Sequence, residues 1–218
     1  MKNRIFAMLG AALLLTCLSI PAMADQFVYT LNIDHCTGGC GASPFGTITV
    51  TDVAANQVSL VLNMQPNMFV QTGQPGSTIG FNLNPNVNNL TVTSSTLPGW
   101  SLDAASAGSL HFDGFGDFEY SLNCCFGNNG GANAQVGLNT VVLTGTGLTA
   151  ASFQQLSSGG SPSVFFAVDI LSASTGNTGP VGTSTPPTTG QVPEPTSVVL
   201  LGSIAALLVG ATRRKLAA

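Results

Sequence analysis

The chain has 218 residues, a formal net charge of −4 at pH 7 and only 6% charged residues, against 44% hydrophobic ones. Nucleic-acid binding needs Lys and Arg side chains to neutralise phosphates, so the region between residues 25 and 191, which has neither, is excluded from that class. Such an acidic region favours cations, neutral glycans or basic protein surfaces as partners. All five basic side chains lie near the two ends of the chain: Lys2, Arg4, Arg213, Arg214 and Lys215.

The first 24 residues have the pattern of a secretory signal peptide. A basic start over residues 1–4 is followed by an apolar run over residues 5–20. Ala22-Met23-Ala24 then offers a cleavage site of the A-x-A kind before Asp25. We therefore expect residues 1–24 to direct export and to be removed.

Residues 25–175 carry short alternations of apolar and polar residues, separated by Gly, Pro, Asn and Asp, and such alternation predicts β-strands. Residues 164–171 are apolar enough for a strand that is buried on both faces. One short helix is expected over residues 150–156, with Thr149 as its N-cap. The sequence therefore predicts one all-β domain, a β-sandwich or jelly roll. The alternating apolar positions are Phe27, Tyr29, Leu31 and Ile33; Ile48 and Val50; Val58, Leu60, Leu62 and Met64; Ile79, Phe81 and Leu83; Leu90 and Val92; Trp100 and Leu102; Phe118, Tyr120 and Leu122; Val141 and Leu143.

The composition changes after Ser172 to Gly, Thr, Ser and Pro, and Val181 is the only bulky side chain before Gln191. A segment of this kind has little apolar surface to bury. We therefore expect residues 176–191 to be a Gly/Thr/Pro-rich linker that separates the β-rich body from a membrane.

Residues 192–218 have three parts. Val192-Pro193-Glu194-Pro195 comes first, residues 196–212 follow without a charge, and Arg213-Arg214-Lys215 closes the segment. As a helix the uncharged run is about 25 Å long, the short end of what spans a bilayer core. A helix is the form that satisfies the backbone in lipid, and the basic triplet should stay in the cytoplasm.

This order of motif, span and basic cluster resembles the PEP-CTERM sorting signal. The resemblance implies that an exosortase, a membrane-embedded cysteine protease, recognises Pro193, Glu194 and Pro195 and cuts near them. It also implies a transient stage in the inner membrane, with Arg213 and Arg214 on the cytoplasmic side, followed by release to the cell surface or the exopolysaccharide matrix. A plain tail anchor behind a rigid proline linker is the alternative.

Three short segments extend this resemblance into the body of the chain. They are residues 116–120, 166–170 and 175–179, which resemble the recurring β-rich body of many proteins that carry this signal. The resemblance implies a shared β-rich domain and no known activity.

The exported part has four cysteines, Cys36, Cys40, Cys124 and Cys125. An even number in an oxidising compartment predicts two disulfides. A bridge between Cys124 and Cys125 is strained, so we favour cross-pairing of the first two cysteines with the last two. Such a bridge closes a loop of roughly ninety residues and contributes about 4–5 kcal/mol by the chain-entropy model. The alternative is a zinc site formed by His35, Cys36, Cys40 and Cys124.

No catalytic arrangement is evident in the sequence. Ser109, His111 and Asp113 share one expected strand at two-residue spacing, which places them side by side without convergence. Asp117 and Glu119 flank Phe118, and their carboxyl groups would lie about 6–7 Å apart, near glycosidase separations. Because both lie on one strand, whereas glycosidases gather such groups across a cleft, we expect a protein that is not an enzyme.

The same acidic segment is a candidate cation site. Asp113, Asp117 and Glu119 are separated by glycines that let the chain curl, and calcium prefers oxygen ligands. Acidic side chains that merely prevent edge pairing of strands are the favoured explanation. Trp100, the only tryptophan, is expected in the core rather than stacked on a sugar.

These observations predict an exported, exosortase-sorted structural protein of the cell surface or the exopolysaccharide matrix, with no cofactor. The alternative is a calcium-assisted, lectin-like glycan-binding module that uses Asp113, Asp117 and Glu119. A secreted glycosidase is a third hypothesis, and it requires a second acidic cluster that faces Asp117.

Overall fold

A computed structural model describes residues 24–71, 77–96, 99–104, 110–124 and 138–192. The predicted signal peptide, apart from Ala24, and the predicted sorting signal, apart from Val192, lie outside these ranges. Residues 25–190 form one compact unit.

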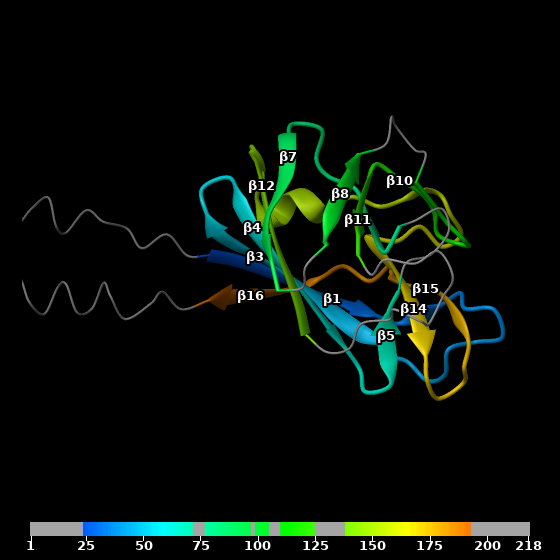
Figure 1. Ribbon diagram of the computed structural model, residues 1–218. Helices are drawn as coiled ribbons and strands as arrows, with labels where there is room; N and C mark the ends of the chain where they lie inside the picture. Colours follow the sequence, from blue (N-terminus) through cyan, green and yellow to red (C-terminus); the bar gives the residue numbers. More distant parts are fainter. Residues whose placement is uncertain (1–23, 72–76, 97–98, 105–109, 125–137, 193–218) are drawn as a thin grey trace, which may run out of the picture. The chain divides into compact units, whose positions relative to one another are not determined.

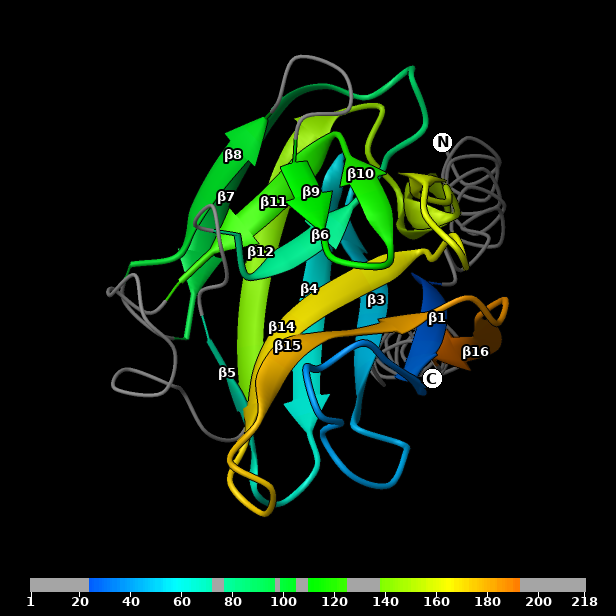
Figure 2. The same cartoon turned by 90° about the vertical axis from the view of Figure 1, so that its right-hand side faces the viewer.

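Two large antiparallel sheets make up most of this unit (Figures 1 and 2). The first has six strands, which in order across the sheet are β16 (Thr188–Val192), β1 (Ala24–Leu31), β3 (Gly46–Ala54), β4 (Gln57–Met64), β12 (Leu138–Thr146) and β7 (Asn88–Ser95). The second has seven strands, with β5 (Met68–Val70) paired to β14 beside a row formed by β2 (Ile33–Asp34), β15 (Thr178–Thr183), β14 (Phe166–Ser172), β6 (Ile79–Phe81), β11 (Tyr120–Asn123) and β8 (Ser101–Ala104).

Large side chains from both sheets meet in one core. Tyr29 and Ile48 come from the first sheet, Phe81 and Phe166 come from the second, and all four are fully buried. The rings of Tyr29 and Phe166 lie with their centroids 4.8 Å apart in an edge-on arrangement. This is the arrangement of a β-sandwich, so the all-β class expected from the alternating residues is confirmed at that level.

A smaller third sheet, called the outer sheet below, covers part of the second large sheet on the side away from the shared core. Its strands are β13 (Ser158–Gly159), β10 (Gly116–Phe118) and β9 (Leu110–Phe112). Phe112, Phe115 and Phe118 point from it into a second buried cluster with Val164 and Ala167. The molecule therefore has two cores, one on each face of the seven-stranded sheet.

The floor of the second core consists of small residues. Ala167 of β14 lies opposite Gly80 of β6 on one side and Gly182 of β15 on the other. A methyl group added to Gly80 would lie 2.6 Å from a ring carbon of Phe112, and one added to Gly182 would lie 2.9 Å from Phe115. The phenylalanine rings therefore rest directly on the backbone of the sheet.

The predicted linker over residues 176–191 is wrong, because β15 and β16 lie within it and belong to the two large sheets. Val181 is fully buried in the shared core, and its neighbours in β15 pair with β14 along the whole strand. Two of the glycines that suggested an unpacked segment are tightly packed: Gly182 lies against the ring of Phe115, and Gly179 lies against the backbone of Cys36. In β15 the absence of bulk therefore reflects tight packing, whereas residues 184–186 are exposed.

The predicted helix over residues 150–156 is shorter and tighter than expected. A 3-10 helix, η1 (Ala150–Phe153), ends where Gln155 pairs with Asn82 in an isolated bridge. Asp52 Oδ1 accepts the backbone N–H of Ala150 at 2.7 Å, which satisfies one free donor at the start of η1. Burial raises the pKa of Asp52, while this hydrogen bond lowers it.

Among the described residues no helix is both long and apolar enough to cross a membrane. The predicted span over residues 196–212 lies outside the described ranges.

Candidate functional site

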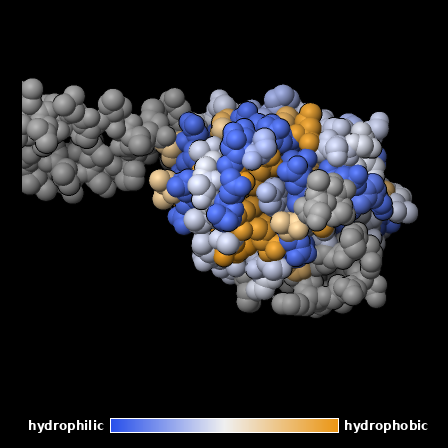
Figure 3. Space-filling view, turned by 90° about the horizontal axis from the view of Figure 1, so that it is seen from above, coloured by the Kyte–Doolittle hydropathy of each residue, from blue (hydrophilic) through white to orange (hydrophobic). Residues whose placement is uncertain are grey.

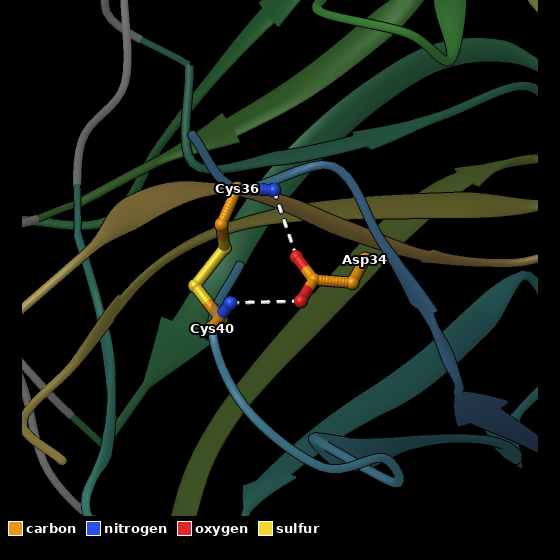
Figure 4. A group of neighbouring side chains, drawn as sticks. All are labelled: Asp34, Cys36 and Cys40. Atoms are coloured by element: carbon orange, nitrogen blue, oxygen red, sulfur yellow. Dashed lines mark hydrogen bonds between the residues drawn. A yellow bond between two sulfur atoms is a disulfide. The ribbon is translucent and has the colours of Figure 1, made fainter. Parts of the chain in front are cut away.

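A disulfide joins the two ends of the cysteine loop, which is residues 36–40. Cys36 and Cys40 form a disulfide with their Cα atoms 5.6 Å apart (Figure 4). Cys124 is disulfide-bonded as well, and Cys125 lies outside the described residues. The predicted cross-pairing of Cys36 and Cys40 with the later cysteines is therefore wrong.

The reason for the short closure lies in the residues between the two cysteines. Gly38 and Gly39 have φ values of +86° and +82°, which side chains rarely adopt and which allow a tight turn. Cys36 and Cys40 are only four positions apart, so the chain-entropy model gives this bridge about 2 kcal/mol, against about 4–5 kcal/mol for the predicted long loop.

The carboxylate of Asp34 holds both ends of the cysteine loop. One carboxylate oxygen accepts the N–H of Cys36 at 2.8 Å and the other accepts the N–H of Cys40 at 2.7 Å (Figure 4). These three residues are also the one group in the described chain whose potential metal-ligand atoms lie within 4.8 Å of one another. Zinc binds thiolates, and both sulfurs are held in the bridge, so neither this group nor the predicted zinc site with His35 and Cys124 fits a metal.

The candidate cation ligands Asp113, Asp117 and Glu119 lie in different parts of the fold. Asp113 lies in the exposed turn after β9, Asp117 lies in β10, and Glu119 lies between β10 and β11. No described group of clustered metal-ligand side chains contains any of the three. The chain passes from the outer sheet to the seven-stranded sheet at Glu119.

Asp117 is held by a histidine instead. His111 lies opposite Asp117 across the outer sheet, and its Nδ1 is 2.8 Å from Asp117 Oδ1. Ser158 of β13 lies opposite Asp117 on the other side. The carboxylate therefore stands between the imidazole and the hydroxyl, whereas a serine hydrolase needs the imidazole in the middle. Ser109, from the expected strand, lies outside the described residues.

A groove opens beside Asp117, at the junction of the outer sheet, the turn after β6 and the segment after η1. Its volume is about 440 Å³, within the range of small-molecule sites. The lining combines carboxylates, amides, a hydroxyl and aliphatic side chains: Asn82, Leu83, Pro85, Asp117, Glu119, Gln155, Leu156 and Ser158.

The walls of the groove are fixed by Asn82. This buried side chain donates from Nδ2 to the carbonyl of Leu156 at 2.7 Å and accepts at Oδ1 from the N–H of Glu119 at 2.7 Å. It thus ties the strand break after β10 to the segment after η1. The groove is consequently formed before any ligand arrives.

The two carboxylates of the groove come from one stretch of chain, and the facing wall carries Gln155, Leu156 and Pro85. A glycosidase requires two carboxyl groups on opposite sides of the scissile bond. The second acidic cluster that the glycosidase hypothesis requires is not among the lining residues.

Few large apolar side chains are strongly exposed among the described residues. Figure 3 shows one face of the molecule, on which an apolar strip runs between polar side chains. The large hydrophobic side chains exposed among the described residues are Val53 and Leu156, and Leu156, 48% exposed, belongs to the groove. Trp100 is buried in the shared core, as expected, and offers no platform to a sugar.

Asp169 is the carboxylate whose pKa is shifted most among the described residues. Burial raises the pKa of Asp169 to about 6, the hydrogen bond from Gln71 lowers it, and the charge of Asp113 raises it further. Asp169 lies on the same face of β14 as Ala167, two residues further along. Its hydrogen bond comes from Gln71 Nε2 at 3.2 Å, and it does not line the groove.

Sequence patterns single out Asp117 and Glu119 but not the rest of the groove. Asn82, Gln155 and Ser158 lie about forty residues from them along the chain, and polar residues of this kind are common in loops. The pairing of β10 with β13 places Ser158 opposite Asp117, while a bridge to Gln155 and a hydrogen bond from Glu119 position Asn82. No local spacing in the sequence predicts these contacts.

No family model matches the chain, and no curated protein and no solved structure shows significant similarity to it.

Proposed function

We propose that the chain is an exported, non-enzymatic structural protein of the cell surface or the exopolysaccharide matrix, sorted by an exosortase. The observation that carries this proposal is the position of the compact unit. Residues 25–190 make up the compact unit, and the two predicted terminal signals occupy the sequence on either side of it. The residues resembling the sorting motif, Pro193, Glu194 and Pro195, follow β16 directly.

Cell fractionation tests this proposal. The combined substitutions Pro193→Ala, Glu194→Ala and Pro195→Ala should leave an uncut chain in the inner membrane, whereas the original chain reaches the surface or the medium. Pro186→Ala with Pro187→Ala is the matched control, since it removes two nearby prolines outside the motif. Release of the motif variant, or release from cells without an exosortase, would contradict the proposal.

The groove favours a second candidate function, a glycan-binding module. Carboxylate, amide and hydroxyl side chains beside exposed aliphatic surface match the two faces of a sugar ring, which carries hydroxyls at its rim and C–H groups on its faces. This version is stated without calcium, because no described cluster of three or more potential metal-ligand side chains contains Asp113, Asp117 or Glu119. Co-sedimentation with the producer's exopolysaccharide, with and without chelator, tests it: binding that survives the chelator supports it, and no binding contradicts it.

A further inference from the structure

We propose that the groove beside Asp117 binds a glycan unit that carries a free amine, such as a hexosamine without its acetyl group. This inference rests on the proposed glycan-binding role and names the ligand class. It is carried by three features of the groove: its charge, its hydrogen-bonding groups and its aliphatic shelf.

The carboxylates of the groove have no lysine or arginine among the described residues to balance their charge, and His111 is the basic side chain that contacts Asp117. Asp117 and Glu119 both line the groove. All Lys and Arg residues of the chain lie in the two terminal segments, outside residues 25–190. An anionic sugar, such as a uronic acid, would therefore be repelled, whereas an ammonium group would gain charge-assisted hydrogen bonds.

The orientation of Asp117 leaves one of its oxygens for a ligand. His111 Nδ1 lies 2.8 Å from Oδ1, and this contact fixes the carboxylate. No hydrogen bond to Oδ2 is found among the described residues. The exposed side chain of Glu119 lines the groove beside it, while its backbone is held by Asn82. Two carboxylates in one groove give an ammonium group, with three donors, acceptors on more than one side.

The remaining lining suits the rest of a sugar ring. Gln155 and Ser158 present an amide and a hydroxyl, which donate to and accept from ring hydroxyls. Leu156, which is 48% exposed, and Pro85 both line the groove and offer aliphatic surface to the C–H face of the ring. A simple metal cation would leave this shelf unused, which favours an organic cation.

Calorimetric titration of the full-length chain in detergent tests the proposal. The probes are a glucosamine tetramer, the fully N-acetylated tetramer and cellotetraose. We expect the glucosamine tetramer to bind and the two neutral oligomers to bind at least about tenfold more weakly, because charge-assisted hydrogen bonds are roughly twice as strong as neutral ones. Added salt should weaken the binding of the amine-bearing tetramer.

Two variants with the same change in net charge locate the site. Asp117→Asn with Glu119→Gln should reduce the affinity for the glucosamine tetramer at least about tenfold. Asp25→Asn with Asp103→Asn removes two exposed carboxylates outside the groove and should leave the affinity within about twofold.

Three outcomes would overturn the inference. Equal losses in the two variants would show attraction to net charge without a site. Equal binding of the N-acetylated and free-amine tetramers would contradict the ligand class, and no binding of any tetramer would contradict the site. The fractionation experiment is independent of all three, so export and sorting can hold when the groove fails.

Discussion

The two cores lie on opposite faces of the seven-stranded sheet, and they differ in which sheets contribute their large side chains. In the shared core both sheets contribute large side chains, such as Tyr29 from one and Phe166 from the other. In the second core the outer sheet contributes the rings, and the large sheet contributes the small residues Gly80, Ala167 and Gly182. Hydrophobic alternation in the sequence predicts the first core. It does not predict the floor of the second core, because small residues carry little hydrophobic signal.

The strands of the large sheet serve both cores at once. Successive side chains of a strand point to opposite faces, so β15 places Val181 in the shared core and Gly182 under Phe115. Removal of β15 should consequently destabilise both cores. A substitution on one face of β15 should destabilise only the core on that face.

The largest effect is expected from removing β15 and β16. A chain of residues 25–176 loses a strand that pairs with β14 from Thr178 to Thr183, together with the fully buried Val181. Thermal unfolding followed by circular dichroism should show no cooperative transition for this fragment and a cooperative one for residues 25–190. Equal transitions in the two fragments would mean that residues 176–191 are a linker after all.

Gly182→Val should break the second core and leave the first in place. The added methyl groups would overlap the ring of Phe115, and overpacking of this kind costs about 3 kcal/mol. Hydrogen exchange should show faster opening of β9 and β10 than of β3 and β4. Ala54→Val, at an exposed position, is the control, and unchanged exchange in the outer sheet would contradict the packing described here.

Asp169 should make the protein more stable as the pH falls. Its pKa is about 6 in the folded protein, against 3.8 for an ordinary aspartate, so the folded state binds a proton more tightly than the unfolded chain does. Stability is therefore gained as the pH falls from about 6 to about 4, by about 2 kcal/mol after allowance for partial exposure. Urea unfolding of Asp169→Asn at both ends of this window should show that increment missing; an unchanged pH dependence would contradict the assignment.

Tyr29→Phe should have the smallest effect, and it should stabilise. The hydroxyl of Tyr29 is buried in the shared core without a hydrogen-bond partner among the described residues, and burial raises its pKa. Removing the hydroxyl relieves the cost of an unsatisfied group and should add about 1 kcal/mol to the free energy of unfolding. Tyr120→Phe is the control at a half-buried position, and a marked loss in Tyr29→Phe would reveal a partner for the hydroxyl.

Sequence reasoning succeeded where a strand has one buried and one exposed face. The alternation in β1 and β4 placed Tyr29 and Leu60 in the core, and the apolar run of β14 indicated burial on both faces. It failed at β15. Hydrophobicity reports how much apolar side chain a segment can bury, and it does not report how closely an aromatic ring packs on the backbone of a glycine.

The site was predicted only in part for a related reason. Asp117 and Glu119 stood out as close carboxylates, and both do line one groove. The other lining residues are brought there by the pairing of β10 with β13 and by the contacts of Asn82 with Gln155 and Leu156, which depend on the whole topology. In the cysteine loop, likewise, the conformations of Gly38 and Gly39 decided the pairing, and loop entropy did not.

The central claim is that the junction of the outer sheet with the sandwich is a ligand site. Nuclear magnetic resonance of the full-length chain in detergent, titrated with the glucosamine tetramer, tests it most directly. We predict shifts in the side-chain amide of Gln155 and the backbone amides of Glu119 and Ser158, with the strands β3 and β4 unchanged. Shifts confined to other surfaces, or none at all, would contradict the claim.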